Sequence, residues 1–534
     1  MSLVDSVVIV FYILGILAIG LWVVRKRTLN AESYFLAGHS LKWPVIGAAL
    51  FASNISTIHL VGLAASGFND GLVWGNFEWM AVFTLILLSL IFAPFYYKNK
   101  ISTLPEFLEK RYNSTARSFL AFFALLGALF MHIGVSLYAG AVVFEHFFGI
   151  NVYVSILVIS FITACYTVVG GLQSVVITET IQAVILIGGA LVLTIYAIMA
   201  LPDQGIDSWE ALTAAAKPDQ LSIVPSAANS SGLTWPAILL GYPVLGIWYW
   251  CADQTIVQRV LGASTLRDAK IGPLFAAAIK ILPVFILVLP GVLGYVLFKD
   301  IITDANDTFP VLITELLPNG LKGLMAAAML AALMSSIAAA LNSAGTLVSI
   351  DIVKRNRPTT SDKQQVLIGR ITAVITMLIA ISWSPLIAKF NSIFEAVVVL
   401  LSVISPPITA VFIWGVFWKR GNHQGAVATF AGGFVLGLAA FLIDFPVFGD
   451  VKILTENWGI SFMMQAWWLF ILSSMIFVLS SLLTPAPDYD RIRSVTLSTP
   501  WIFLKKDEGE KINWPLIISG ILIVLMIFLY FMVG

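Results

Sequence analysis

This chain of 534 residues is 59% hydrophobic and 11% charged, and its formal net charge is +1. About a quarter of the residues in a globular domain are charged, so this chain lacks the polar surface of a soluble protein of its size. Its lysines and arginines form no basic stripe, so the sequence predicts no nucleic-acid partner and points to the lipid bilayer as the solvent.

Fourteen apolar runs are long enough to cross a bilayer, which predicts an all-α membrane protein with about fourteen transmembrane helices. The polar segments 201–234 and 485–512 are too short for a further globular domain, so residues 1–534 are expected to form one polytopic membrane domain. The runs lie near residues 4–24, 43–67, 72–97, 118–148, 152–170, 174–200, 235–258, 271–298, 321–350, 367–387, 393–418, 424–444, 462–484 and 513–533.

Lysine and arginine are distributed unevenly between the loops. With the N-terminus outside, 24 of the 30 cations lie in internal loops, five lie in external loops, and Lys280 lies inside a helix. Positive charge accumulates on the cytoplasmic side of membrane proteins. We therefore expect a multi-pass protein of the plasma membrane with both termini extracellular or periplasmic.

Ionisable residues inside the apolar runs are costly in lipid and are therefore functional candidates. Glu78 and Lys280 lie near the middle of their runs, where a charge cannot snorkel, and we favour a function for both. For Asp253, beside Arg259 near the inner end of its run, we favour a structural ion pair or a snorkelling end group. His132 is expected to be a hydrogen-bonded core histidine. The full set is Glu78, Glu179, Asp253, Lys280, His59 and His132.

The middle of the second run, residues 51–59, is unusually polar and reads Phe-Ala-Ser-Asn-Ile-Ser-Thr-Ile-His. This pattern favours a local break in the helix, and non-helical backbone at that depth survives only where it lines a cavity. The freed carbonyl oxygens suit a hard cation. Transporters place their substrate and coupling ion at such breaks.

In the ninth run, Ala332, Ser335 and Ser336 share one helix face. Two hydroxyls beside a backbone carbonyl would provide half of a sodium site. Close packing of small residues between helices explains the same face equally well from spacing alone.

Eight short motifs follow one another between residues 34 and 420. Together with the topology, they make the sequence resemble the sodium/solute symporter family, close to its sodium/glucose cotransporter branch. The motifs are Tyr34-Phe35-Leu36-Ala37-Gly38, Ala52-Ser53-Asn54-Ile55, Phe77-Glu78-Trp79, Leu104-Pro105-Glu106-Phe107, Gly170-Gly171-Leu172, Trp248-Tyr249-Trp250-Cys251 with Asp253-Gln254 and Gln258-Arg259, Ser335-Ser336 with Leu341-Asn342-Ser343, and Phe417-Trp418-Lys419-Arg420.

The resemblance implies the leucine-transporter-type fold, in which five helices are repeated upside down. Residues 43–200 would form the first repeat and residues 235–418 the second. One helix, 4–24, would precede this core, and three peripheral helices in 424–534 would follow it.

The resemblance also implies a sodium site. In that family, carbonyls on the first core helix, and a carbonyl with hydroxyls on the eighth, hold the ion; the matching residues are Ala52, Ile55, Ala332, Ser335 and Ser336. The family's aspartate linked to a second cation site corresponds to Glu179, which is therefore a candidate for a second cation or for coupling.

Six residues match the family's sugar pocket: Asn54, His59, Glu78, Tyr249, Trp250 and Lys280. By the same resemblance, Leu63, Phe77 and Phe394 would close the outer side and Tyr249 the inner side. Three positions depart from the pattern, because Gly246 replaces an asparagine or threonine, Ala81 replaces a serine of the galactose carrier, and Val398 replaces a sugar-binding glutamine. The resemblance therefore leaves the solute open.

The expected function is sodium-coupled import of a small polar solute, in first place a sugar, by alternating access, and not enzyme catalysis. The alternatives within transport are a polyol such as inositol, or an acidic sugar or organic anion held by Lys280. A proton-coupled carrier and a membrane sensor are the remaining alternatives. The 485–512 segment is short for a sensor's output domain, and five scattered histidines and two cysteines provide no haem or metal constellation.

Overall fold

The computed structural model describes residues 2–25, 30–225, 231–385, 393–444, 452–497, 504 and 511–534. In these ranges the chain is built from helices and their connections, apart from one isolated β-bridge between Leu41 and Ala263. The expected all-α class is confirmed.

The first part of the chain forms ten α-helices. They are α1 (Leu3–Trp22), α2 (Ala31–Leu36), α3 (Trp43–Asn54), α4 (Thr57–Asp70), α5 (Asn76–Leu87), α6 (Ala93–Lys98), α7 (Leu104–Arg111), α8 (Ser114–Leu126), α9 (Val135–Phe148) and α10 (Val152–Met199). Short π-helical segments, η3 (Leu88–Phe92) and η4 (Gly127–Gly134), join α5 to α6 and α8 to α9.

The helices that follow are α11 (Trp209–Ala215), α12 (Tyr242–Ile247), α13 (Gln254–Leu261), α14 (Leu266–Ile279), α15 (Leu289–Phe298), α16 (Thr308–Leu316), α17 (Leu321–Thr346), α18 (Asp362–Trp383), α19 (Ile393–Phe417), α20 (His423–Asp444), α21 (Phe462–Leu482), α22 (Tyr489–Ile492) and α23 (Trp514–Val533). The π-helical segments η6 (Ala237–Gly241), η7 (Trp248–Ala252), η8 (Val284–Val288), η10 (Leu347–Lys354) and η13 (Ile453–Asn457) lie between or beside them.

Within the described residues, ten helices are long and apolar enough to span a membrane, and the bent pair α3 and α4 raises the number to eleven. Fourteen runs were expected. The difference arises because Val152–Gln204 contains two of them on either side of Gly171, because Ala237–Ala252 is apolar but shorter than a full span, and because only the part Leu401–Phe417 of α19 enters this count. Each expected run corresponds to helical structure.

The second expected run is broken where its polar residues lie. Helix α3 ends at Asn54, Ile55 and Ser56 are extended, and α4 begins at Thr57 with a bend of 64° between the two helices. The Ser56 side chain caps α4, which stabilises the new helix start. A second break, which the sequence did not reveal, lies at Asp253, where an extended residue separates η7 from α13.

Helix α17 forms the buried centre of the bundle, and small side chains let its neighbours approach closely. At Gly189 of α10, for example, a Cβ would lie 2.9 Å from the Ala328 Cβ. The alanine-rich face of α17 therefore serves the close packing that the sequence allowed for. It also brings Ser335 and Ser336 against α3.

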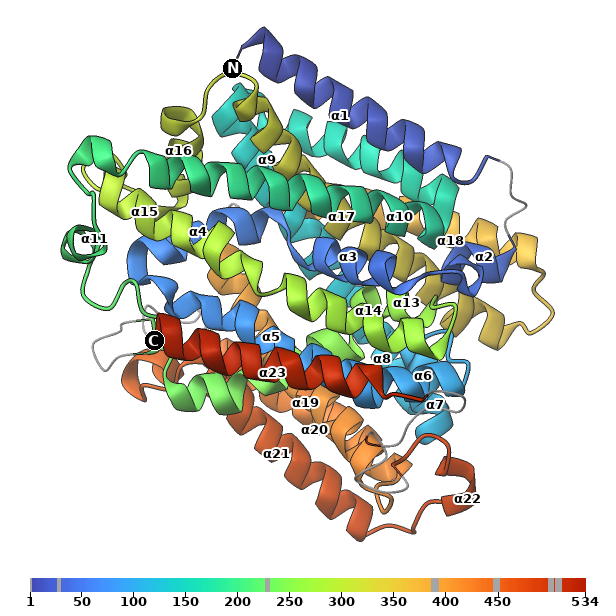
Figure 1. Cartoon of the computed structure of the whole chain (residues 1–534). Helices are drawn as coiled ribbons and strands as arrows, with labels where there is room; N and C mark the ends of the chain where they lie inside the picture. The colour runs from blue at the N-terminus through green and yellow to red at the C-terminus, as the bar shows by residue number, and fades with distance from the viewer. Residues whose placement is uncertain are drawn as a thin grey trace.

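Both chain ends lie at one end of the bundle (Figure 1). The Asp5 carboxylate accepts hydrogen bonds from the Gly320 and Gly323 N–H groups, and the Ile223 N–H donates to the Val533 carbonyl at 3.0 Å.

At the opposite end of the bundle, Leu41 bridges Ala263, and Arg117 donates to Asp351 at 2.7 Å. These contacts join loops that are expected on the cytoplasmic side, and they lie at the end of the bundle away from both termini.

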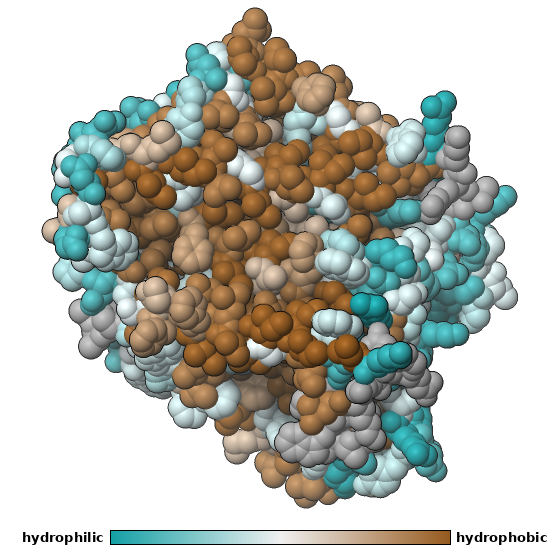
Figure 2. Space-filling view, in the orientation of Figure 1, coloured by the Kyte–Doolittle hydropathy of each residue, from teal (hydrophilic) through white to brown (hydrophobic). Residues whose placement is uncertain are grey.

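The surface carries the hydrophobic face that a bilayer requires. Figure 2 shows hydrophobic residues over the middle of one face, with hydrophilic residues gathered at its left and right ends. Exposed side chains such as Phe11, Val524 and Phe531 belong to α1 and α23, two helices at this surface. The other described residues leave these side chains largely uncovered, which suits contact with lipid.

Candidate functional site

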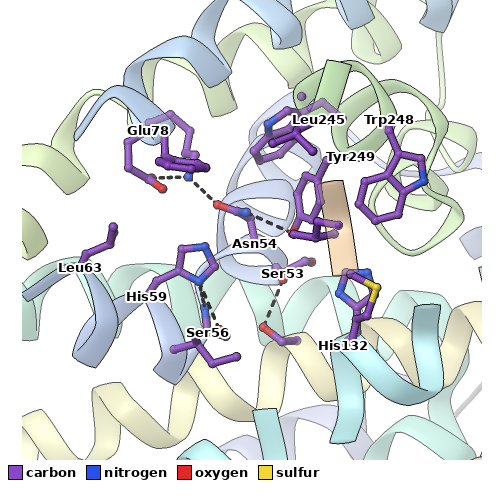
Figure 3. Close-up of a pocket in the computed structure, with 18 of the residues that line it drawn as sticks. Ser53, Asn54, Ser56, His59, Leu63, Glu78, His132, Leu245, Trp248 and Tyr249 are labelled. Atoms are coloured by element: carbon purple, nitrogen blue, oxygen red, sulfur yellow. Dashed lines mark hydrogen bonds and ion pairs between the residues drawn. The ribbon is translucent and has the colours of Figure 1, made fainter. Parts of the chain in front are cut away.

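A cavity of about 160 Å³ lies beside the break between α3 and α4. Side chains from α3, α4, α5, η4, α12, η7, α17 and the end of α14 converge on it (Figure 3). The structure brings together all six residues of the expected solute pocket. The sequence-predicted residues that line the cavity are Asn54, His59, Leu63, Phe77, Glu78, Tyr249, Trp250, Lys280 and Ser336.

A row of polar contacts crosses this cavity. The Lys280 ammonium donates to the Glu78 carboxylate and, at 2.5 Å, to Asn54 Oδ1. Asn54 Nδ2 in turn donates to the Tyr249 hydroxyl at 3.1 Å. Both charged side chains are buried, and each neutralises the other. Removing one member of a buried ion pair leaves an uncompensated charge, which costs about 3–5 kcal/mol.

Lys280 reaches the cavity because its helix ends there. Helix α14 ends at Ile279, and Pro283, which lacks an N–H, cannot continue the helical hydrogen bonds past this point. The ammonium also lies 5.6 Å from the centre of the Trp250 ring, close enough for a cation–π interaction. Trp250 is thereby fixed beside the ion pair with its ring available to the cavity.

His59 lies in the first turn of α4. The Ser56 N–H points to His59 Nδ1 at 3.3 Å, so Nδ1 is the accepting nitrogen and the imidazole is neutral in this arrangement. The remaining ring nitrogen, Nε2, then carries the proton and is a hydrogen-bond donor. Its position beside the cavity adds a donor to the carboxylate and ammonium already described.

The residues expected to close the cavity have distinct surroundings. The Phe77 ring stacks between Trp74 and Phe462, with centroids 5.7 and 6.1 Å away, and Leu63 is buried. Tyr249 contacts Trp250 and receives the Asn54 bond. The side chains of Phe394 and Val398 lie outside the described residues.

The hydroxyls of α17 face the end of α3. Ser335 Oγ lies 2.7 Å from the Ala52 carbonyl oxygen and 3.0 Å from that of Ala332. Ser336 Oγ lies 3.1 Å from the Ser53 carbonyl and 3.2 Å from that of Ala332. Ile55 is buried in the break itself, where its backbone has left the helical conformation. The hydroxyls of Ser335 and Ser336 thus lie beside backbone carbonyls of α3 and α17, and oxygen donors of this kind suit a hard cation.

Glu179 is engaged on both carboxylate oxygens. Arg259 donates to it through Nη2 at 2.5 Å and Nε at 3.2 Å, and Ser53 Oγ donates at 2.9 Å. Glu179 therefore connects α10 to α3 and α13 through buried groups.

Asp253 forms the structural pair that was favoured for it, but its partner is His132 of η4 and not the neighbouring Arg259. Asp253 caps α13 by accepting the Thr255 N–H, which turns its carboxylate away from Arg259 and toward His132 Nε2 at 2.9 Å. His132 is hydrogen-bonded, as expected, but it lines the cavity instead of an apolar core.

Several residues that line the cavity were not predicted from the sequence, above all Tyr242. A Cβ at Gly246 would lie 2.7 Å from the Tyr242 ring and 2.9 Å from Thr84 Cγ2, so a larger residue at 246 would displace Tyr242. The spacing of four residues between Tyr242 and Gly246 on one helix was the available signal. Met131 and Ser136 also line the cavity and carried no distinguishing pattern.

Residues 34–433 match the model of the sodium:solute symporter family. The sodium/myo-inositol cotransporter 2 of Sus scrofa is 37% identical over 473 residues, covering 83% of this chain and 70% of that protein. The sodium/glucose cotransporter 2 of Rattus norvegicus is 35% identical over 481 residues, covering 83% and 72%.

Among solved structures, a Na⁺-coupled sialic acid symporter superposes with a TM-score of 0.77 at 23% identity, covering 91% of this chain and 99% of that one. The nucleobase-cation-symport-1 family transporter Mhp1 superposes with a TM-score of 0.55 at 13% identity, covering 88% and 98%. These similarities show the leucine-transporter-type fold. The chain therefore belongs to the sodium:solute symporter family, and it is a multi-pass membrane transporter that moves a solute together with sodium.

Proposed function

We propose that this transporter imports a neutral polyhydroxylated solute, a sugar or a cyclic polyol such as inositol, with sodium across the plasma membrane. The observation that carries the proposal is the cavity beside the α3–α4 break, in which Glu78, Lys280 and Asn54 form one polar row. The relatives described as sodium/glucose and sodium/myo-inositol cotransporters support the same solute class.

The cavity offers the groups that hydroxyl-rich rings need. Glu78 accepts hydrogen bonds, Lys280 donates them, and Asn54 does both through its amide. Trp250 and Tyr249 add flat apolar faces for the carbon side of a ring. A solute with several hydroxyls can satisfy this alternation of donors and acceptors, whereas an apolar solute would leave buried polar groups unpaired.

The pairing of Lys280 favours a neutral solute over an acidic one. Glu78 already neutralises Lys280, and the other described residues that line the cavity include no second lysine or arginine. A carboxylate would therefore have to compete with Glu78 for the same ammonium. An acidic sugar or organic anion is disfavoured on this ground.

We propose that the carbonyls of Ala52, Ile55 and Ala332 and the hydroxyls of Ser335 and Ser336 hold the sodium ion. The hydroxyls would turn their hydrogens away and present lone pairs to the ion. Asn54 lies between Ala52 and Ile55 in the chain, so sodium would fix the backbone of the segment that also orients the solute site. This shared segment is the physical basis for coupling.

One sodium ion suffices for accumulation. A membrane potential of roughly 100 mV supplies ~2.3 kcal/mol per charge, and a tenfold sodium gradient supplies ~1.4 kcal/mol. The total of ~3.7 kcal/mol corresponds to about 500-fold accumulation of solute. Because Glu179 is fully engaged by Arg259 and Ser53, we assign it to positioning α3 and not to a second cation.

In the transport cycle we propose, sodium binding favours the outward-open state and the solute joins it. The gates Leu63, Phe77 and Phe394 then close the outer side before Tyr249 opens the inner side. The repeats 43–200 and 235–418 would move against each other in this step. The loop charges favour termini that are extracellular or periplasmic.

Uptake into proteoliposomes tests the proposal. Radiolabelled glucose, galactose, myo-inositol and sialic acid are offered with external sodium, or with choline at the same pH. We expect sodium-dependent uptake of at least one neutral solute and none of sialic acid. Uptake that persists in choline, or uptake of the acidic sugar alone, would contradict the proposal.

A further inference from the structure

The last described helix, α23, contacts the part of α5 that carries Glu78. The Tyr530 hydroxyl donates to Asn76 Oδ1 at 2.8 Å, and its ring meets Trp79 edge to face at 5.1 Å between centroids. Asn76 and Trp79 lie on either side of Glu78 in α5. A helix outside the ten-helix core thus contacts the residues on either side of Glu78, and Figure 1 shows α23 in front of α5.

Trp79 connects the two halves of the ion pair. Its indole Nε1 donates to the Ile281 carbonyl at 3.2 Å, and Ile281 follows Lys280 directly. Trp79 is fully buried. The residue after Glu78 is therefore bonded to the residue after Lys280, so that displacement of the Trp79 ring would shift both charged side chains.

Asn76 is held from two further sides. Its Nδ2 donates to the carbonyls of Val73 and Ile223, both at 2.8 Å. The Ile223 N–H donates to the Val533 carbonyl, one turn after Tyr530. The outer end of α5, the segment around Ile223 and α23 thereby form a closed set of hydrogen bonds, in which Tyr530 supplies the contact nearest to Glu78.

We propose that Tyr530 is a positioning residue for the solute site, acting through Asn76 and Trp79 on the geometry of Glu78 and Lys280. The proposal rests on the assignment of that ion pair to solute binding. It gives one of the three peripheral C-terminal helices a role in solute affinity. The sodium ligands proposed on α3 and α17 make none of these contacts.

Tyr530→Phe tests the role, because it keeps the ring on Trp79 and removes only the hydroxyl. We expect the KM for the solute to rise about two- to tenfold, the scale of one hydrogen bond. The maximal rate and the sodium concentration for half-maximal uptake at saturating solute should stay unchanged. Phe531→Leu, a substitution of the neighbouring side chain that is 84% exposed, is the matched control and should leave all three values unchanged.

A second variant covers the case in which Tyr530→Phe does not fold. Trp79→Phe keeps an aromatic ring and removes the donor to Ile281, and it should raise the KM in the same way. Unchanged KM in either folded variant would overturn the role of Tyr530, as would an equal shift in the sodium requirement.

The double variant Glu78→Gln with Lys280→Met distinguishes failure of the solute-site assignment from failure of the role proposed for Tyr530. If it leaves the KM at the wild-type value, the assignment of the solute site fails. If it abolishes uptake while Tyr530→Phe behaves as wild type, only the inference about Tyr530 fails.

Discussion

At the scale of single residues, the solute site is built from pairings between segments far apart in the chain. The cost of burying a charge indicated Glu78 and Lys280 individually, but their contact spans 202 positions and no local pattern encodes it. The same limit explains why the sequence placed Asp253 beside Arg259 but did not indicate that Asp253 pairs with His132 and Arg259 with Glu179. The sequence indicated which residues are functional candidates, but only the fold shows which residues they contact.

The first prediction at this scale concerns Ser336. Ser336→Ala removes a proposed sodium ligand and should raise the sodium concentration for half-maximal uptake at least fivefold, which corresponds to about 1 kcal/mol. Ser343→Ala on the same helix is the control, since the Ser343 hydroxyl is buried without a hydrogen-bond partner among the described residues. Equal sodium requirements in the two variants would remove Ser336 from the site.

The ion pair makes a prediction about stability. Glu78→Gln alone leaves Lys280 as an unpaired buried charge and should lower stability by about 3–5 kcal/mol. Glu78→Gln combined with Lys280→Met removes both charges and should restore most of that loss without restoring uptake. Melting temperatures of the purified proteins measure this difference, and a double variant no more stable than the single one would contradict it.

At the scale of elements, the break between α3 and α4 followed from its polar residues, because their side chains compete with helical hydrogen bonding and lie too deep for water. The break at Asp253 did not, because an aromatic and apolar run precedes it and its aspartate resembled a pairing residue. The π-helical segments likewise carried no pattern. Breaks are predictable where the side chains that stabilise them are local.

Gly171 gives a prediction for the break within α10. Its φ of +61° is in a region that alanine adopts at a cost, and a Cβ would collide with the Tyr34 carbonyl. Gly171→Ala should therefore lower the free energy of unfolding by more than about 2 kcal/mol, which a lower melting temperature would reveal. Gly188→Ala, in the same helix with open space around it, should be neutral or stabilise by about 0.5–1 kcal/mol. Equal effects of the two changes would contradict the assigned backbone.

At the scale of the whole molecule, the membrane-spanning all-α class and the uneven distribution of loop charges were readable from sequence, because lipid imposes both. The three C-terminal helices were expected to be peripheral. The contacts of Phe462 with Phe77 and of Tyr530 with Asn76 show that two of them reach the residues around Glu78. Apolar periodicity cannot reveal such contacts, since a lipid-facing helix and a supporting helix look alike.

The orientation can be tested by labelling. Glu210 and Lys363 are exposed and lie in segments expected on opposite sides of the membrane. A membrane-impermeant thiol reagent on intact cells should label Glu210→Cys and not Lys363→Cys. The reverse pattern would invert the proposed topology.

The central claim is that sodium and solute share the segment from Ala52 to Ile55, so each must strengthen the binding of the other. Equilibrium binding of a radiolabelled neutral solute at low and saturating sodium, with sodium binding at low and saturating solute, tests this directly. Linkage requires the two affinity ratios to be equal, and we predict a common factor above five. A solute affinity that does not change with sodium would contradict the account.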